Sequence, residues 1–241
     1  MRRAVLSDIH GNIDALEAVL ADLRRSGIES VACLGDFVGY GAAPNECVAA
    51  LKSLIEAGVV GNHDQASTGR LRLGGFRSDA AVAARWTDER LTPENRAWLI
   101  ELPFSVVWHG IRLVHASPTE PDEWRYVLSV GEAIEELRGY PERVCLIGHS
   151  HVAGAFVESQ RRVTYVREPE IAIDPDIRYL VNVGSVGQPR DGDWRAAYLV
   201  VDEDRSVLQH VRVEYDVDRA ARRILDAGLP PFLAERLRWG E

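Results

Sequence analysis

The chain has 241 residues, 46% of them hydrophobic and 27% charged, which is typical of a globular protein with a sizeable core. Its formal net charge of −9 argues against stable binding of duplex nucleic acid, which needs a basic surface. No apolar stretch approaches the length of a membrane-spanning helix, so no membrane partner is expected. The three cysteines, Cys33, Cys47 and Cys145, are few, odd in number and without metal-type spacing, which favours a cytoplasmic location. Cys33 and Cys145 lie in apolar runs and are expected to be buried free thiols.

Strand-loop-helix units open the chain. Each begins with a short apolar run, continues through a polar or glycine-rich loop and enters a segment of helical periodicity. Three units in succession predict an α/β fold with a mostly parallel sheet. The expected elements are a strand at 4–6 with a helix at 13–25, a strand at 30–34 with a helix opening at Pro44, and a strand at 59–60.

Residues 65–102 change character and predict a helical insertion within one domain that spans residues 1–241. Two helices are expected, over 78–90 and 93–101, the second with Thr92 as N-cap and Pro93 at its first position. This pair directly follows the Asn62-His63 loop. The insertion therefore either covers the site as a partial lid or packs on the flank of the sheet.

The second half of the chain is rich in strands, which predicts a second sheet packed on the first. His109-Gly110 is a tight hairpin signal between two of these strands. The expected strands lie at 104–108, 111–115, 144–147, around 158–162, 179–183, 196–201 and 207–213, with helices at 129–138 and 218–227.

Side chains of the kind that bind metals follow five strands. Asp8 and His10 lie on a strand-to-helix loop, the place where open α/β sheets hold ligands, and together they suit a divalent transition metal. Read alone, this loop could equally be a helix N-cap, Asn12, with incidental polar neighbours. Five such loops favour a metal site over incidental polar neighbours. They carry Asp8, His10, Asp36, Asn62, His63, His115, His149 and His151.

These ligands are too many for one cation, so the sequence predicts two. Asp36 is the expected bridge, because a shared carboxylate holds two cations about 3.5–4 Å apart. Mixed oxygen and nitrogen ligands admit Mn, Fe, Zn, Ni or Co, with manganese favoured. The expected partition gives Asp8, His10 and His151 to one metal and Asn62, His115 and His149 to the other.

His63 remains after the ligands are assigned. The positive charge of the metal pair would bind phosphate oxygens and make hydroxide available near neutral pH. His63 is the expected catalytic acid, which protonates the leaving oxygen. Asp64 is expected either to orient the His63 imidazole or to cap the loop. Asn62 is also a candidate for contact with the substrate.

Residues 7–12, 35–41, 61–64 and 148–151, with His115, together resemble the calcineurin-like metallophosphoesterase superfamily. Residues 182–193 (Asn-Val-Gly-Ser-Val-Gly-Gln-Pro-Arg-Asp-Gly-Asp) resemble its small bacterial and archaeal phosphodiesterase branch. The resemblance implies a four-layer α-β-β-α fold, in which two mixed β-sheets pack as a sandwich flanked by α-helices. It also implies a dinuclear metal centre with Asp36 bridging and His63 as the acid.

One departure from the family pattern concerns the phosphate-binding arginine. Protein-phosphatase members carry Asp-Arg-Gly after the second aspartate, whereas this chain has Val38-Gly39-Tyr40-Gly41, which disfavours that activity. Arg190 is the expected replacement, because a guanidinium clamps phosphate. The alternative is a salt bridge from Arg190 to Asp191 or Asp193. The glycines at 184 and 187 either bring backbone amides to phosphate or only form a turn.

The resulting prediction is a phosphodiesterase acting on a small phosphodiester or nucleotide by attack of a metal-bridging hydroxide. A hydrolase of dinucleoside polyphosphates, which cleaves a pyrophosphate bond, is the alternative and would differ only in the shape of its pocket. Phe37, Tyr40 and Trp86 either stack a base there or belong to the core. A non-catalytic metal-binding scaffold is disfavoured, because no ligand is missing and His63 is present.

Overall fold

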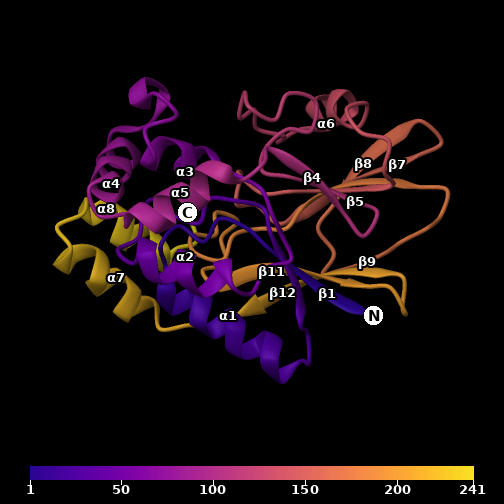
Figure 1. The fold of residues 1–241 in the computed structure, drawn as a ribbon. Coiled ribbons are helices and arrows are strands. Elements are labelled where there is room, and N and C mark those ends of the chain that lie inside the picture. Colours follow the sequence, from indigo (N-terminus) through magenta and orange to yellow (C-terminus); the bar gives the residue numbers. More distant parts are fainter.

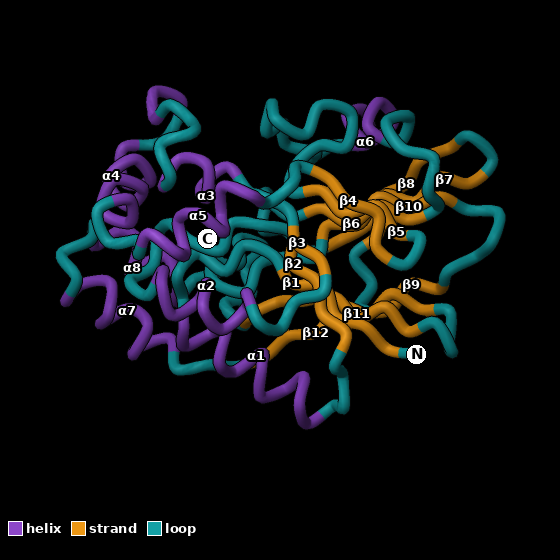
Figure 2. The backbone as a smooth tube through the Cα atoms, viewed as in Figure 1, coloured by secondary structure: helices purple, strands orange, loops and turns teal.

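The computed structural model describes residues 1–241 and contains two sheets of six strands each. The first sheet contains β1 (Arg2–Leu6), β2 (Ser30–Cys33), β3 (Ala57–Gly58), β9 (Glu170–Ala172), β11 (Ala196–Asp202) and β12 (Val207–Val213). The second contains β4 (Ser105–Trp108), β5 (Ile111–Val114), β6 (Val144–Ile147), β7 (Gly154–Ser159), β8 (Arg162–Val166) and β10 (Arg178–Asn182). Figure 2 shows them as two stacks of strands.

Both sheets are mixed, as predicted. Their strand orders are β3-β2-β1-β11-β12-β9 and β4-β5-β6-β10-β7-β8. The first three strands of the chain pair in parallel, whereas β11 joins β1 in the antiparallel direction. In the second sheet β5, β6 and β10 run parallel, and β4 and β7 are antiparallel to their neighbours.

The helices cover the outer faces of the two sheets (Figure 1). Most lie on the side of the first sheet, and α6 lies against the second. Their bounds are α1 (Ile13–Arg25), α2 (Pro44–Lys52), α3 (Asn62–Ser67), α4 (Ser78–Asp88), α5 (Pro93–Glu101), α6 (Val130–Glu136), α7 (Val217–Asp226) and α8 (Pro231–Glu235). None combines the length and the apolar character that crossing a bilayer requires.

Alternation along β1 shows how the four layers form. Ala4 and Leu6 pack into the cluster shared with the helices, whereas Val5 belongs to the cluster between the two sheets. Successive strand residues point to opposite faces, so a continuously apolar strand can be buried on both sides. A third cluster lies between α6 and the second sheet. The observed layers therefore match the predicted α-β-β-α sandwich.

Most predicted elements are observed with shifts of one to three residues at their ends. The helix at 13–25 is confirmed at both ends, and Asn12 caps it by accepting from the Ala15 amide at 3.1 Å. The third strand, expected at 59–60, lies instead at Ala57–Gly58, where it pairs with β2. The hairpin residues His109 and Gly110 both have positive φ, as a tight primed turn requires.

The register of β1 on β2 decides where the site forms. Leu6 lies opposite Cys33, so both strands end together and their polar loops leave the sheet side by side. The Asp8 amide then donates to the Gly35 carbonyl at 3.0 Å, and the His10 amide to the Asp36 carbonyl at 2.9 Å. The two loops are thereby joined by backbone hydrogen bonds before any side chain contributes.

Candidate metal centre

The loops after the strands adopt an unusual backbone. Left-handed φ angles are uncommon for residues other than glycine, and they cluster at functional sites, where surrounding structure offsets their cost. Eleven such residues occur in the chain, and five of them are predicted metal ligands: Asp8 (53°), His10 (51°), Asp36 (52°), His149 (64°) and His151 (60°). Sequence patterns gave no sign of this feature.

Four of the predicted ligands form one compact buried cluster. Ligand atoms of Asp8, His10, Asp36 and His151 all lie within 4.8 Å of one another. Asp8 Oδ1 is 3.2 Å from His151 Nε2 and 3.8 Å from His10 Nε2. The first predicted metal group and the predicted bridge are therefore brought together.

The second predicted group lies against the first. His115 Nε2 is 3.2 Å from Asn62 Oδ1, 3.4 Å from Asp36 Oδ2 and 3.9 Å from Asp8 Oδ1. The rings of His115 and His149 have their centroids 5.2 Å apart. The His149 amide donates to Asp8 Oδ2 at 3.1 Å, which links its loop to the first group. All seven predicted ligands thus meet in one place.

Backbone carbonyls orient three of the histidines. Nδ1 of His10 donates to Val38 O at 3.2 Å, Nδ1 of His115 to Leu34 O at 2.7 Å, and Nδ1 of His151 to Gln188 O at 2.6 Å. In a neutral imidazole this leaves Nε2 with a free lone pair. All three Nε2 atoms face the centre, as metal ligands do.

Several polar atoms at the centre lack a partner, and a cation would provide one. Asp8 Oδ1, Asp36 Oδ2 and His149 Nε2 are buried without hydrogen bonds. His10 Nε2 and His151 Nε2 lie only 3.1 Å apart, although the Nδ1 hydrogen bonds leave a lone pair on each. Such an arrangement is repulsive unless a positive ion or a proton lies between them. The donor set therefore fits divalent metal.

The pKa values of the site also indicate that its buried carboxylates favour a positive charge beside them. Burial by itself disfavours a charged imidazole, yet the carboxylates of Asp36 and Asp8 raise the pKa of His115 to about 9. Burial, with a further contribution from His115, lowers the pKa of His149 to about 3. Without a metal, the buried carboxylates thus hold a proton on one histidine, and a metal ion would replace that charge.

The structure corrects the expectation that Asp64 orients His63. Asp64 Oδ2 accepts from the amides of Asp36 at 2.8 Å and Gly61 at 3.0 Å, and its Oδ1 accepts from Val38 at 3.2 Å. Both oxygens are therefore used on the backbone, and none of their hydrogen bonds reaches the imidazole. Asp64 acts as the loop cap, the other reading of the sequence.

His63 is held by packing and by its own backbone. Its amide donates to Asp36 Oδ1 at 2.8 Å, and its ring lies against the rings of Tyr40 at 4.4 Å and Phe76 at 5.2 Å between centroids. A Cβ on Gly39 would lie 2.6 Å from His63 Nδ1, so only glycine fits there. Burial lowers the pKa of His63 to about 4 against the opposing charge of Asp36, which keeps the free ring neutral at pH 7.

Arg190 makes neither of the salt bridges offered as alternatives. Asp191 pairs with Arg212 and Asp193 with Arg195, whereas Arg190 donates to the Tyr40 hydroxyl at 3.2 Å and to Gln188 Oε1 at 2.8 Å. Its guanidinium therefore remains uncompensated by any carboxylate.

The glycine-rich loop after β10 supports the metal loop from behind. The amides of Val186 and Gly187 donate to the carbonyls of Ser7 at 3.0 Å and Asp8 at 2.9 Å. A side chain on Gly187 would collide with the Ile9 carbonyl. Both amides already donate to backbone carbonyls and cannot donate to phosphate as well. Of the two alternatives for this loop, phosphate binding or a turn, the structure supports the turn.

A cleft of about 560 Å³ opens above the centre. Asn62, His63 and His149 line its inner part. Residues 71–80 of the helical insertion line one side, although movement of the insertion as a lid stays a prediction. Of the aromatic residues considered for base stacking, Tyr40 lines the cleft, whereas Phe37 is fully buried and packs on Trp98 and Trp86 lies outside the cleft.

Several residues that line this cleft were not predicted from the sequence. Trp124 and Tyr126 line it, and the Tyr126 ring stacks on the His149 ring with centroids 4.1 Å apart. Arg72, Arg77 and Arg236 also line it. They lie outside the motifs, in loops, at the start of α4 or near the end of the chain, where no local pattern marked them.

Comparison with known proteins places this centre in a family. Residues 1–206 match the model of the calcineurin-like phosphoesterase superfamily domain. The chain belongs to this superfamily. An uncharacterized protein of Methanocaldococcus jannaschii is 41% identical over 238 residues, covering 97% of this chain and 96% of its own.

Solved structures agree with that assignment. The crystal structure of a metallophosphoesterase from Sphaerobacter thermophilus has a TM-score of 0.88 and 36% identity, covering 100% of this chain and 99% of its own. A hypothetical protein from Pyrococcus horikoshii OT3, with a TM-score of 0.81, 23% identity and coverage of 100% and 98%, shares the fold. Phosphoesterases of this superfamily are metal-dependent hydrolases, and Asp8, His10, Asp36 and His151 form the ligand cluster expected of one.

Proposed function

We propose that this protein hydrolyses phosphodiesters at a centre of two divalent cations. Asp36 carries the proposal: its Oδ2 lies 3.5 Å from His10 Nε2 and 3.4 Å from His115 Nε2 and has no hydrogen-bond partner. It faces both groups of ligands, which is the position that a bridging carboxylate needs. Two bound cations would neutralise charge on the phosphoryl group and supply a hydroxide nucleophile near neutral pH.

The other residues of the centre take roles that follow from their positions. Asp8, His10 and His151 would hold one cation, and Asn62, His115 and His149 the other, with manganese favoured among Mn, Fe, Zn, Ni and Co. Arg190 binds a phosphoryl oxygen, and Asn62 contacts the substrate from the inner part of the cleft. His63 donates a proton to the leaving oxygen. An anionic substrate beside its ring favours the imidazolium and so raises its pKa.

The lining of the cleft by separate segments of the chain supports a diester. The phosphorus atom of a diester carries a substituent on each of two oxygens, so the substrate needs room on both sides of the reacting atom. Phe76 and Arg77 line one side of the cleft, and Trp124 and Tyr126, from a different loop, also line it. We also expect the substrate to be a small molecule or nucleotide, no stable complex with duplex nucleic acid, and a cytoplasmic location, in keeping with the net charge of −9 and three free thiols.

Hydrolysis of a chromogenic diester tests the proposal directly. Protein stripped of metal and supplied again with Mn²⁺ is expected to hydrolyse bis(4-nitrophenyl) phosphate with a higher kcat/KM than 4-nitrophenyl phosphate. Without added metal, both rates should fall to background. Preference for the monoester would overturn the diester assignment in favour of a phosphomonoesterase. Failure with both substrates, despite bound metal, would contradict the proposed function.

The acid role of His63 predicts dependence on the leaving group. In His63→Ala, kcat/KM for a diester with an alkyl leaving group is expected to fall by about 10²–10⁴-fold, the usual contribution of a positioned acid. The loss with bis(4-nitrophenyl) phosphate should be much smaller, because 4-nitrophenolate leaves without a proton. His109→Ala, in an exposed hairpin turn away from the site, should leave both rates unchanged. Equal losses with both substrates would rule out the acid role.

A further inference from the structure

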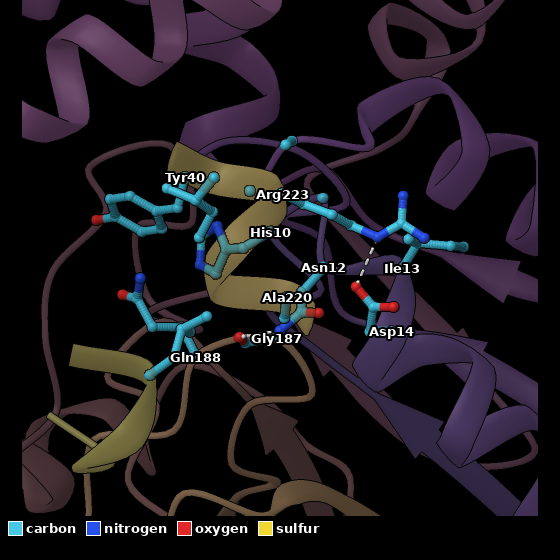
Figure 3. Close-up of a pocket in the computed structure, with 14 residues that line it drawn as sticks. His10, Asn12, Ile13, Asp14, Tyr40, Gly187, Gln188, Ala220 and Arg223 are labelled. Carbon is cyan, nitrogen blue, oxygen red and sulfur yellow. Dashed lines mark hydrogen bonds and ion pairs between the residues drawn. The ribbon is translucent and has the colours of Figure 1, made fainter. Parts of the chain in front are cut away.

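The C-terminal segment of the chain, residues 214–241, is fastened to the metal loop. Asp14, buried in the first turn of α1, pairs with Arg223 of α7 at 2.9 Å (Figure 3). It also pairs with Arg219 of the same helix. Asp14 is the second residue of α1, which begins immediately after the His10–Asn12 loop. Between these elements the remaining space is only about 10 Å³, enough for about one water molecule. The segment is therefore a firmly packed part of the site's surroundings.

The end of this segment lies beside Arg190. The Gly192 amide donates to the Gly240 carbonyl at 3.1 Å, and a Cβ on Gly240 would lie 2.8 Å from the backbone of Asp193. Earlier in the segment, the Ala227 carbonyl accepts from Trp86 Nε1 of α4 at 3.1 Å. These contacts hold the end of the segment in place, and Arg236, just after α8, lines the cleft. Arg236 also lies beyond residue 206, where the family match ends.

Four arginines line the cleft: Arg72, Arg77, Arg190 and Arg236, here called the arginine wall. Arg77 and Arg236 come from opposite ends of the sequence, yet their Cζ atoms lie 5.6 and 5.3 Å from the centroid of one ring, Phe232. Burial, reinforced by the charge of Arg190, lowers the pKa of Arg236 to about 10, which leaves it cationic at neutral pH.

The arginine wall contains little counter-charge of its own. Arg236 Nε donates to the terminal oxygen of Glu241. No member pairs with an Asp or Glu side chain, whereas neighbouring Arg195, Arg212 and Arg238 each pair with an aspartate. The one carboxylate lining the cleft is that of Glu123. Arg190 and Arg236 are half-buried, and Arg190 Nε is buried without a partner. Gathering like charges in a partly desolvated place, on a chain of net charge −9, is unfavourable unless an anion binds there.

We propose that the three outer members of the arginine wall, Arg72, Arg77 and Arg236, form a second phosphate subsite, so that the substrate carries at least one further phosphate group beside the phosphodiester or phosphoanhydride that is cleaved. This rests on the proposed function and names its substrate class. The reacting phosphate is assigned to the metal ligands and to Arg190, which donates to the hydroxyl of Tyr40 beside His63. Arg72, Arg77 and Arg236 then remain to bind the neighbouring phosphate through charge-assisted hydrogen bonds.

Calorimetric titration of the Mn²⁺-loaded protein with orthophosphate and with tripolyphosphate, at fixed free Mn²⁺, tests the subsite. The native protein is expected to bind tripolyphosphate at least about tenfold more tightly than orthophosphate, because further charge-assisted contacts form. Arg236→Gln should remove most of this preference. The Arg72 side chain is exposed and makes no hydrogen bonds. Arg72→Gln should therefore reduce the preference for tripolyphosphate by a smaller factor without any effect on folding.

The matched control is Arg238→Gln, which removes the same charge two residues away. Arg238 is exposed, pairs with Asp218 at 2.9 Å and does not line the cleft, so its variant should retain the full preference. Arg236→Lys should retain part of the preference, because the lysine ammonium supplies the positive charge but lacks the planar guanidinium that donates paired hydrogen bonds to phosphate. Equal affinity of the native protein for both anions would overturn the subsite. Equal losses in the Arg236 and Arg238 variants would overturn it as well.

The binding and activity results separate the two proposals. Hydrolysis of bis(4-nitrophenyl) phosphate without preference for tripolyphosphate would refute the second subsite and leave the phosphodiesterase standing. Preference for tripolyphosphate that depends on Arg236, in a protein inactive on both chromogenic esters, would support the subsite and refute the proposed function.

Discussion

Replacement of Asp36 by asparagine is expected to reduce kcat/KM on a chromogenic diester by a factor on the order of 10³ or more. The amide has nearly the same shape and can still accept from the His63 amide, a contact of 2.8 Å in the native protein. It removes the charge that faces His10 and His115, and an amide bridges two cations poorly. The bound metal should fall from two equivalents to one or none, measured by elemental analysis after gel filtration.

Thermal unfolding gives an independent measure of the same change. Added Mn²⁺ should raise the Tm of the native protein, because a ligand that binds only the folded state stabilises it. That rise should be small or absent in Asp36→Asn. The control is Asp226→Asn, which removes one carboxylate from the exposed end of α7 and should bind metal normally. Retention of two equivalents of metal together with native activity would exclude Asp36 as the bridge.

Replacement of Gly61 by alanine is expected to damage both stability and activity. The backbone of Gly61 is extended and suits any residue, but its Cβ would overlap Asp36 Oδ1 and the Asp36 amide nitrogen. The loop or Asp36 must move, and forced overpacking of this kind costs about 1–3 kcal/mol. We expect a lower Tm in the metal-free protein and loss of diesterase activity comparable to that of Asp36→Asn.

The control for this change is a glycine with free space around it. Gly131 lies in the first turn of α6, and the nearest atom to a Cβ there would be Ser129 Oγ at 3.8 Å. Gly131→Ala should retain full activity and gain up to about 1 kcal/mol, because alanine loses less conformational freedom in a helix. A Gly61→Ala protein with native Tm and activity would show that the loop holding Asp36 is freely adjustable.

Much of the metal centre was predictable because each part of it is encoded locally. Asp8, Asp36 and His149 each lie within three residues of the end of a short apolar strand. The loops of Asp8 and Asp36 leave neighbouring parallel strands at one edge, whereas His149 follows a strand of the second sheet. The residues that approach one another in space are therefore marked by their place after a strand. The strand-rich second half predicted a second sheet packed on the first, and the resemblance to the superfamily implied the sandwich.

The roles of polar side chains with several available partners were decided only by the tertiary structure. Asp64 follows His63 in sequence, but the backbone amides of Asp36 and Val38 reach its carboxylate, so it supports the loop. Asp191 and Asp193 adjoin Arg190, yet both pair with other arginines and leave it free. Adjacency in sequence does not fix such pairings, because a side chain bonds to whichever donor the packing brings within reach.

The cleft itself likewise came from the fold. Arg77 and Arg236 are separated by most of the chain and carry no motif, and they meet only because α8 packs near α4. Tyr126 stacks on His149 from an irregular loop. The sequence by itself thus determined which side chains gather at the candidate metal centre, because each lies shortly after the end of a strand. The tertiary structure decided what surrounds the substrate, because those contacts join segments whose relation no local pattern encodes.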